Sequence, residues 1–233
     1  MTSNTKFTTK MVMNQVCLVT FNTQLDMAST FVRFQEHYES PKFKGQIFSL
    51  DDYIMYYYEN HANFDYYTEV TGFNFPSNSV SQFINAHILN QTVLRRCELD
   101  FISDLGVKIF SQPFYIIGVF KTKNKKDNAL NHELAHALYY QEQGYRFEVQ
   151  DVLDKYKSIN KLLHPLLSKA EYHKDLWPDE CHAYLMQTEA ELQYDLGDNG
   201  APRGGWHQFY MRTQQERKEL KRIFTAHQEH IFL

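Results

Sequence analysis

Hydrophobic and polar positions divide the chain into a first half of mixed strands and helices and a second half of helices alone. The short apolar, β-branched run at residues 16–21 predicts a buried strand, whereas the polar residues 1–12 predict a flexible tail. Apolar positions along residues 24–38 form one face of a predicted helix, which ends at the turn around Ser40 and Pro41. The fold is therefore expected to begin with a strand followed by a helix.

The same pattern predicts further elements in the first half. They are a strand at 46–50, a helix from 51 to 60, two helices within 77–105 with the second at 92–105, and two β-prone runs at 107–110 and 114–120. Gly106 lies just past the last helix, where glycine is common. Because Ser111, Gln112 and Pro113 separate the two β-prone runs, we expect a hairpin or a pair of strands there.

From Asp127 onward the pattern is almost wholly helical. The expected helices are 128–143, 147–163, 178–195 and 212–228. Gly144, Pro165 and Gly197 are expected to end the first three. Together these elements predict an α+β fold class, with a small sheet in the N-terminal half and a mainly helical C-terminal half. We expect one domain over 13–233, with any internal division near 106–127.

The composition indicates a folded protein with no global preference for a polyanion. The 233 residues are 43% hydrophobic, and a formal charge of −4 gives no reason to expect nucleic acid or an anionic membrane as a partner. Cys17, Cys97 and Cys181 are widely spaced, which argues against a disulfide framework or a thiolate zinc site and favours a reducing compartment. No apolar stretch approaches the roughly 18 residues of a membrane span, so we predict a cytoplasmic protein.

The strongest chemical signal is the pentapeptide His132-Glu133-Leu134-Ala135-His136, an HExxH motif. On a helix, a separation of four residues places both imidazoles on one face about one turn apart, as in a two-point metal clamp. Apolar positions of the same helix fall on the opposite side: Leu130, Leu134, Ala137 and Leu138. The helix is therefore expected to bury its back and turn its histidines toward a cleft.

Zn²⁺ suits this motif because neutral imidazoles and carboxylates are its usual catalytic ligands. An open coordination position lowers the pKa of a bound water to about 7, which makes hydroxide available at neutral pH. Glu133 projects about 100° around the helix from His132, so its carboxylate can lie beside that water and take its proton. The sequence predicts a zinc site with His132 and His136 as ligands and Glu133 as the general base.

A catalytic zinc needs a third protein ligand, and a downstream segment offers one. Pro178 suits the first position of a helix, Glu180 would lie in its first turn, and Ala183 would allow close packing against the metal helix. We favour Glu180 as the third ligand. The rival ligands are His173, Asp179, His182, Glu189 and Glu191. His182 cannot share the face of Glu180, and the structural alternative is that Asp179 and Glu180 simply mark a helix start.

These residues resemble the zincin metallopeptidases, and within them the gluzincin-like group, in which HExxH is followed by a glutamate on a later helix. The match comprises His132, Glu133, His136 and Glu180, the last in a Glu-x-x-Ala-Tyr setting. The resemblance implies a zincin-like fold with two histidine ligands, a glutamate ligand, a glutamate base and a β-strand before the metal helix. The HExxHxxGxxH extension of metzincins is absent, which disfavours that group.

Two further parts of a peptidase site have candidates but no single choice. Zincins commonly bind the substrate backbone along an edge strand, and residues 114–120 are the candidate by position, although a buried central strand explains the run equally well. Peptide hydrolysis also needs a donor at the developing oxyanion. The candidates for this donor are Tyr184, Tyr194, His173, His182 and His207.

The predicted function is a zinc-dependent hydrolase that acts on a peptide or protein substrate. No GxSxG elbow occurs and no cysteine has a protease signature, so nucleophilic serine or cysteine catalysis has little support. The alternatives are a non-catalytic zinc module that serves stability or partner recognition, and hydrolysis of another amide or an ester. Glu133 favours the enzyme, because a structural zinc site needs no base and prefers four protein ligands.

Overall fold

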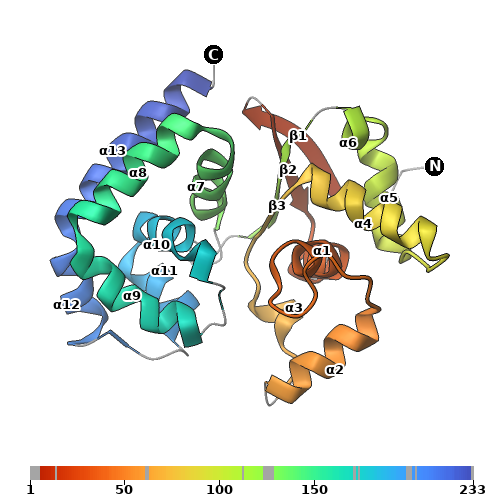
Figure 1. Ribbon diagram of the computed structural model, residues 1–233, viewed down its shortest axis with the longest axis horizontal. Helices are drawn as coiled ribbons and strands as arrows, with labels where there is room; N and C mark the ends of the chain where they lie inside the picture. The colour runs from red at the N-terminus through yellow and green to blue at the C-terminus, as the bar shows by residue number, and fades with distance from the viewer. Residues whose placement is uncertain are drawn as a thin grey trace. The chain divides into compact units, whose positions relative to one another are not determined.

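The computed structural model describes residues 6–13, 15–60, 63–111, 113–122, 129–169, 172, 174–197, 201–202 and 204–231. The chain divides into two compact units, which we call unit 1 (Met1–Lys123) and unit 2 (Asn124–Leu233). Unit 1 runs from red to yellow-green in Figure 1, and unit 2 from green to blue. The fold class is α+β, because unit 1 contains a sheet and the described part of unit 2 is helical.

Unit 1 is built on a four-stranded mixed sheet with the strand order β1-β2-β4-β3. β1 (Phe7–Met13) pairs antiparallel with β2 (Val16–Phe21) across a turn at Gln15, whose φ is 59°. β2 pairs in parallel with β4 (Tyr115–Phe120), and β4 pairs antiparallel with β3 (Phe73–Pro76). β4 is therefore an inner strand, and β1 and β3 form the edges.

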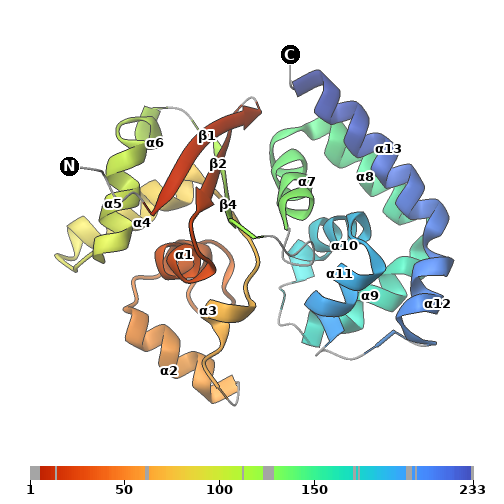
Figure 2. The same cartoon turned by 180° about the vertical axis from the view of Figure 1, so that it is seen from behind.

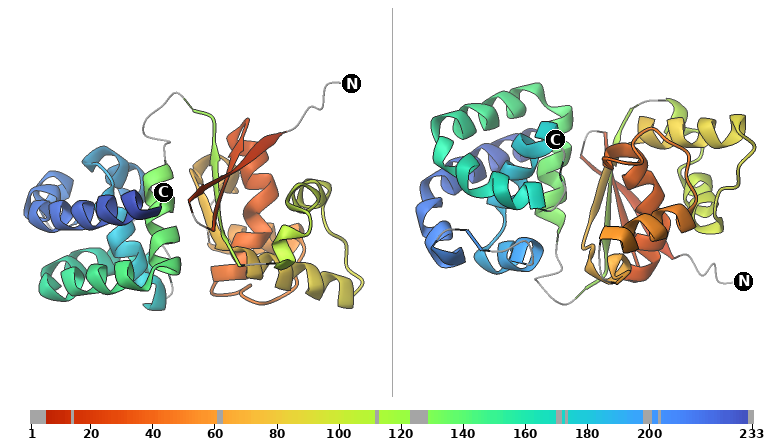
Figure 3. Two further views of the ribbon diagram at one scale, coloured as in Figure 1. Left: turned by 90° about the horizontal axis from the view of Figure 1, so that it is seen from above. Right: turned by 60° about the horizontal axis from the view of Figure 1, so that its bottom comes forward.

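Helix α1 (Gln24–Glu39) packs against strands β2, β3 and β4 of this sheet (Figure 3). It begins after Thr23, whose hydroxyl accepts a hydrogen bond from the backbone N–H of Asp26, the usual role of an N-cap threonine. The remaining helices of unit 1 are α2 (Leu50–Asn60), α3 (Tyr66–Glu69), α4 (Ser77–Leu89), α5 (Arg96–Leu105) and α6 (Lys108–Ser111).

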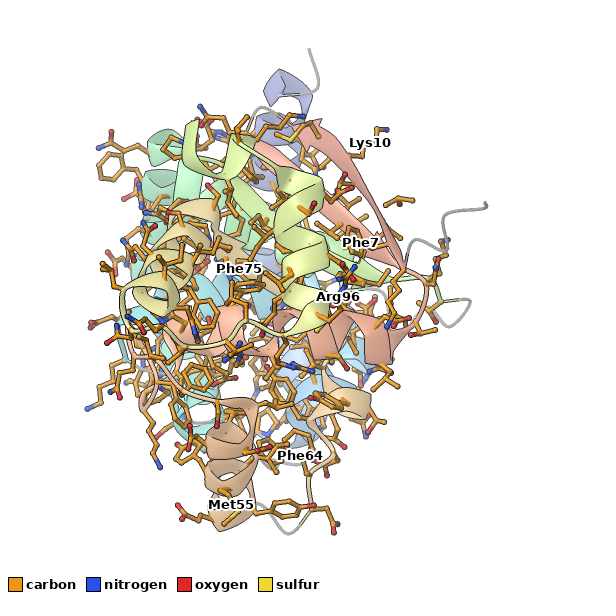
Figure 4. The ribbon with its side chains drawn as sticks, turned by 90° about the vertical axis from the view of Figure 1, so that its right-hand side faces the viewer. Phe7, Lys10, Met55, Phe64, Phe75 and Arg96 are labelled. Atoms are coloured by element: carbon orange, nitrogen blue, oxygen red, sulfur yellow. The ribbon has the colours of Figure 1, made fainter. Side chains whose placement is uncertain are left out.

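The core of unit 1 is centred on the ring of Phe31 in α1. This ring makes edge contacts with five other phenylalanine rings at centroid distances of 4.7–6.4 Å: Phe21, Phe34, Phe73, Phe75 and Phe101. In Figure 4, Phe75 lies within the layer between sheet and helices, whereas Lys10 and Met55 lie at its surface. Edge-to-face packing of this kind is the favourable geometry for aromatic pairs.

Unit 2 consists of helices arranged around α10 (Trp177–Met186), which packs against α7, α8, α9 and α13 (Figure 2). The other helical elements are α7 (Leu130–Gln141), α8 (Gln143–Lys155), α9 (Lys157–Lys169), η2 (Lys174–Leu176), α11 (Glu189–Leu196), α12 (Gly205–Arg212) and α13 (Gln214–Ile231). None of the helices in the described part of the chain combines the length and apolar character that a transmembrane helix needs.

The strand at 16–21 and the helices predicted at 24–38, 51–60 and 92–105 are confirmed, but three predictions in unit 1 are wrong. Residues 7–12 of the expected tail belong to β1, which is polar because it is an exposed edge strand. The expected strand at 46–50 is a loop that leads into α2. The expected hairpin is absent, because residues 108–111 form α6 and β4 pairs with other strands.

Each of these errors has a physical reason. In the loop, the carbonyls of Gln46 and Phe48 bond with side chains of α1, His37 (2.9 Å) and Arg33 (2.8 Å), so they need no neighbouring strand. A four-residue apolar run such as 107–110 is too short for its pattern to distinguish a strand from a helical turn.

The helix boundaries expected in unit 2 also shift. Gly144 lies in the first turn of α8 and Pro165 lies inside α9, so neither residue ends a helix where it was expected to. The single helix expected at 178–195 is divided into α10 and α11, because Thr188 caps α11 through a capping box with Glu191.

Candidate metal centre

Helix α7 presents the HExxH motif in its first turns. Nε2 of His132 and Nε2 of His136 lie 3.0 Å apart, so both rings reach toward the same point. The opposite side of the helix is apolar, with Leu134, Ala137 and Leu138 buried and Leu130 half-buried. The structure therefore confirms that α7 has an apolar back and a separate face that carries the two histidines.

Helix α10 brings Glu180 to the same point. Pro178 starts this helix, Glu180 follows in the first turn, and Oε1 of Glu180 lies 3.7 Å from Nε2 of His136. One ligand atom from each of His132, His136 and Glu180 lies within 4.8 Å of the other two. Ala183 is fully buried, and its small side chain allows α10 to approach α7 closely.

Burial keeps the two histidines in the form that binds a metal. His136 is 2% exposed, and burial lowers its pKa to about 3. Burial also lowers the pKa of His132 far below its usual range, and the neighbouring rings of His136 and His182 add to that effect. Both imidazoles are thus neutral at pH 7, and a metal would displace no proton from them.

The donor set fits Zn²⁺. Two neutral imidazoles and one carboxylate converge from two helices, which is a usual protein ligand set for a catalytic zinc with one open position. Two of the three residues, His136 and Glu180, are buried, and His132 is half-buried.

Glu133 and Tyr184 lie beside these three residues. Glu133 is buried in the turn between the two histidines. The ring of Tyr184 lies 4.9 Å from the ring of His132, and its hydroxyl is 3.1 Å from that of Tyr172. Burial raises the pKa of Tyr184 well above its usual range, and the carboxylates of Glu180 and Glu133 raise it further. The Tyr184 hydroxyl is therefore a proton-bearing group close to both glutamates.

Two of the rival ligands, Asp179 and His182, lie behind His136. Oδ1 of Asp179 is 2.9 Å from Nδ1 of His136, the ring nitrogen that faces away from His132. The same oxygen is 3.4 Å from Nδ1 of His182, which is fully buried. Burial raises the pKa of Asp179 to about 7 and lowers that of His182 to about 4. Neither residue joins the group of donor atoms formed by His132, His136 and Glu180.

The remaining candidates lie elsewhere or outside the described part of the chain. The side chain of His207 is 80% exposed, and its Nδ1 lies 3.3 Å from Oε2 of Glu189. His207 therefore forms a surface pair with Glu189 and does not lie beside His132 and His136. Glu191 accepts a hydrogen bond from the backbone N–H of Thr188 in the cap of α11. His173 and the side chain of Tyr194 lie outside the described residues.

Sequence reasoning missed the position of Asp179 behind His136. It treated Asp179 only as a rival ligand or a helix-start residue, although histidine ligands usually donate their second ring N–H to a carboxylate or carbonyl. The spacing contained a usable signal, because Asp179 and His182 stand at i and i+3 and so share one face of α10.

No protein-family model, curated protein sequence or solved structure matches this chain.

Proposed function

We propose that the protein is a zinc-dependent hydrolase, and specifically a peptidase, with its metal site in unit 2. The observation that carries this proposal is the convergence of donor atoms from His132, His136 and Glu180 within 4.8 Å of one another. Glu133, buried in the turn between the two histidines, is the second support, because it puts a carboxylate where a base would act.

Zn²⁺ held by these three residues would polarise a substrate carbonyl and provide a water with a pKa near 7. Glu133 takes a proton from the attacking water and passes it to the leaving amine, the general base and then general acid of the reaction. Tyr184 keeps its proton at neutral pH and can donate a hydrogen bond to the developing oxyanion.

The peptide class of substrate rests on the resemblance of HExxH and Glu180 to the gluzincin-like peptidases. Since β4 is an inner strand of unit 1, we assign it no role as an edge that binds substrate. Hydrolysis of another amide or an ester would use the same residues and is the closest alternative. The cytoplasmic location stays a prediction, supported by the free thiols of all three cysteines.

A non-catalytic zinc module is the alternative from another class. Structural zinc sites are closed by four protein ligands, whereas three donor groups converge here among the described residues. A structural site would also gain nothing from burying Glu133 beside the ligands.

Metal analysis combined with one substitution tests the proposal. We expect about one zinc per chain, removable by a chelator, and cleavage of peptides in a proteome-derived library. Glu133→Gln should retain zinc and lose cleavage by several orders of magnitude, because it removes the base and keeps the ligands. Glu142→Gln is the matched control, since Glu142 is half-buried at the end of the same helix.

Three results would contradict parts of this proposal. Wild-type protein that holds no zinc and gains no stability on zinc titration would rule out the metal site. Zinc binding without any hydrolysis would favour the non-catalytic module. Full activity in Glu133→Gln would remove Glu133 from the mechanism.

A further inference from the structure

A second histidine and an aspartate are packed behind the proposed metal ligand His136. One carboxylate oxygen, Oδ1 of Asp179, lies 2.9 Å from Nδ1 of His136 and 3.4 Å from Nδ1 of His182. Both rings are almost fully buried, at 2% and 0% exposure. The three side chains thus form a row, His136–Asp179–His182, that leads from the metal face of α7 into the helical core.

The environment of His182 fixes the plane of its ring. The ring of Tyr139 is stacked on it at a centroid distance of 5.0 Å and an angle of 24°, and Tyr145 meets its edge at 5.7 Å and 70°. Tyr139 belongs to α7 and Tyr145 to α8, so His182 of α10 is held between two other helices. An imidazole held in this way can present its nitrogens in only a few directions.

Packing alone does not explain a histidine at this position. A buried imidazole carries two polar nitrogens, and leaving them without hydrogen bonds costs free energy that a phenylalanine ring would avoid. Among the described residues, Nδ1 of His136 and Oδ1 of Asp179 have no aligned hydrogen-bond partner, whereas the backbone carbonyls of Asp179 and Ala135 lie within reach of the His182 ring and partly offset the lowering of its pKa by burial. Asp179 is the carboxylate within hydrogen-bonding distance of both rings.

We propose that Asp179 and His182 are positioning residues for His136, with Asp179 accepting the Nδ1–H of His136 and His182 holding Asp179 through its own Nδ1–H. This inference rests on the proposed metal site. The first hydrogen bond fixes the tautomer of His136, so that the lone pair of Nε2 points toward His132 and Glu180. The second keeps the carboxylate from rotating away, since Tyr139 and Tyr145 hold the His182 ring.

The row also makes zinc binding depend on how α10 is packed. This one helix carries Asp179, Glu180 and His182. Glu180 reaches the proposed metal site directly, whereas Asp179 and His182 reach it through His136 from another side of the helix. A small rotation of α10 would therefore disturb the ligand Glu180 and the support of His136 together. This predicts that loss of the row lowers zinc affinity although no direct ligand is changed.

Zinc affinity of the full chain, measured by competition with a chromophoric chelator, tests the row. Asp179→Leu and His182→Phe should each weaken zinc binding by about 10- to 100-fold, the usual effect of losing a partner of a metal ligand. His182→Asn keeps an N–H donor near the position of Nδ1 and should recover part of the loss, whereas His182→Gln should not. A role in packing alone predicts the reverse, because phenylalanine preserves the ring and asparagine does not.

The matched control is His164→Phe. His164 also packs against an aromatic ring, that of Trp177 at 4.5 Å, but belongs to α9 and has no place in the row. This substitution should leave zinc affinity unchanged.

A second measurement needs no variant and so does not depend on any substituted chain folding. Long-range ¹H–¹⁵N spectra of the zinc-loaded wild type should show His136 protonated at Nδ1 and metal-bound at Nε2. Zinc on Nδ1 of His136, or affinities within about twofold of wild type for both Asp179→Leu and His182→Phe, would overturn the inference. Wild-type protein that binds no zinc would instead overturn the proposed function, so the two failures are distinguishable.

Discussion

Unit 1 and unit 2 both bury charged or titratable side chains, and they differ in where the hydrogen bonds of those side chains go. In unit 1, Arg33 donates from Nε and Nη2 to the two oxygens of Glu98, at 2.8 and 2.5 Å, and from Nη1 to the carbonyl of Phe48 at 2.8 Å. Glu98 also accepts from the backbone N–H of Arg95. Every partner of this pair is supplied by unit 1 itself.

In unit 2, by contrast, buried polar atoms of several side chains face one another. Nδ1 of His136 and Oδ1 of Asp179 have no aligned partner among the described residues. Two facing Nε2 atoms 3.0 Å apart can share at most one proton. Polar burial alone therefore does not identify a site, whereas imidazole and carboxylate groups that converge on one point indicate a place for a ligand.

The largest expected effect comes from breaking the satisfied pair of unit 1. Glu98→Leu leaves the Arg33 guanidinium buried without its counter-charge, which typically costs about 3–5 kcal/mol. Hydrogen exchange of β2 and β4 measures this loss, because both tryptophans, Trp177 and Trp206, lie in unit 2 and do not report on unit 1.

Replacing both partners, Arg33→Met with Glu98→Leu, should recover most of that stability, since no buried charge is then left. A double variant as unstable as Glu98→Leu would show that Arg33 contributes more than its charge pairing.

The second prediction applies the same change, glutamate to leucine, to the cluster of His132, His136 and Glu180. Glu180→Leu should weaken zinc binding by more than about 100-fold. This is a larger loss than is usual for a residue that only hydrogen-bonds to a metal ligand. In metal-free protein the same change should leave the free energy of unfolding unchanged or higher, because it removes a carboxylate that is buried beside two neutral histidines. Zinc titration and urea unfolding followed by tryptophan fluorescence measure the two effects. Unchanged zinc affinity would exclude Glu180 as a ligand.

The third prediction concerns acid. The pKa values of His136 and His182 are lowered to about 3 and about 4, and that of His132 is lowered as well, so unfolded chains bind more protons than folded ones below pH 6.5. By pH 5, each of these buried neutral imidazoles therefore lowers the free energy of unfolding by about 2 kcal/mol. Asp179 and Asp195, whose pKa values burial raises to about 7 and about 6, act in the opposite direction and together offset about 3–4 kcal/mol between pH 7 and pH 5.

Unit 2 of the metal-free protein should therefore be about 2 kcal/mol less stable at pH 5 than at pH 7. Urea unfolding followed by tryptophan fluorescence at the two pH values measures the difference. Equal stability at both values would mean that the three imidazoles are not buried in neutral form.

The sequence contained enough to predict the elements and the site residues whose signals are local. The run at 16–21 is strand-forming by itself, and four-residue spacing places His132 and His136 on one face of any helix. Glu180 could be favoured because Pro178 fixes where its helix starts. Each of these inferences needs only neighbouring residues.

What could not be predicted depends on contacts distant in sequence. The loop at 46–49 is set by the side chains of Arg33 and His37. The polar strand β1 exists because β2 offers it a hydrogen-bonded ladder. Likewise, the place of Asp179 behind His136 follows from how α10 is rotated against α7, which no pattern within either helix specifies.

The smallest expected effect tests how tightly unit 1 is packed around Phe31. A Cβ added to Gly118 of β4 would lie 2.5 Å from the Phe31 ring, closer than non-bonded carbon atoms approach. Because edge contacts with five phenylalanines hold that ring, Gly118→Ala should cost about 1–3 kcal/mol, the usual range for an overfilled core. Phe31→Leu removes the clashing ring atoms but opens a cavity, so each change alone should destabilise unit 1. The double variant should lose less than the sum of the two, since the new methyl group occupies space that the ring vacated. Hydrogen exchange of β4 measures the loss of unfolding free energy in each variant. If the loss in the double variant equals the sum of the two single losses, the residues at positions 118 and 31 do not interact.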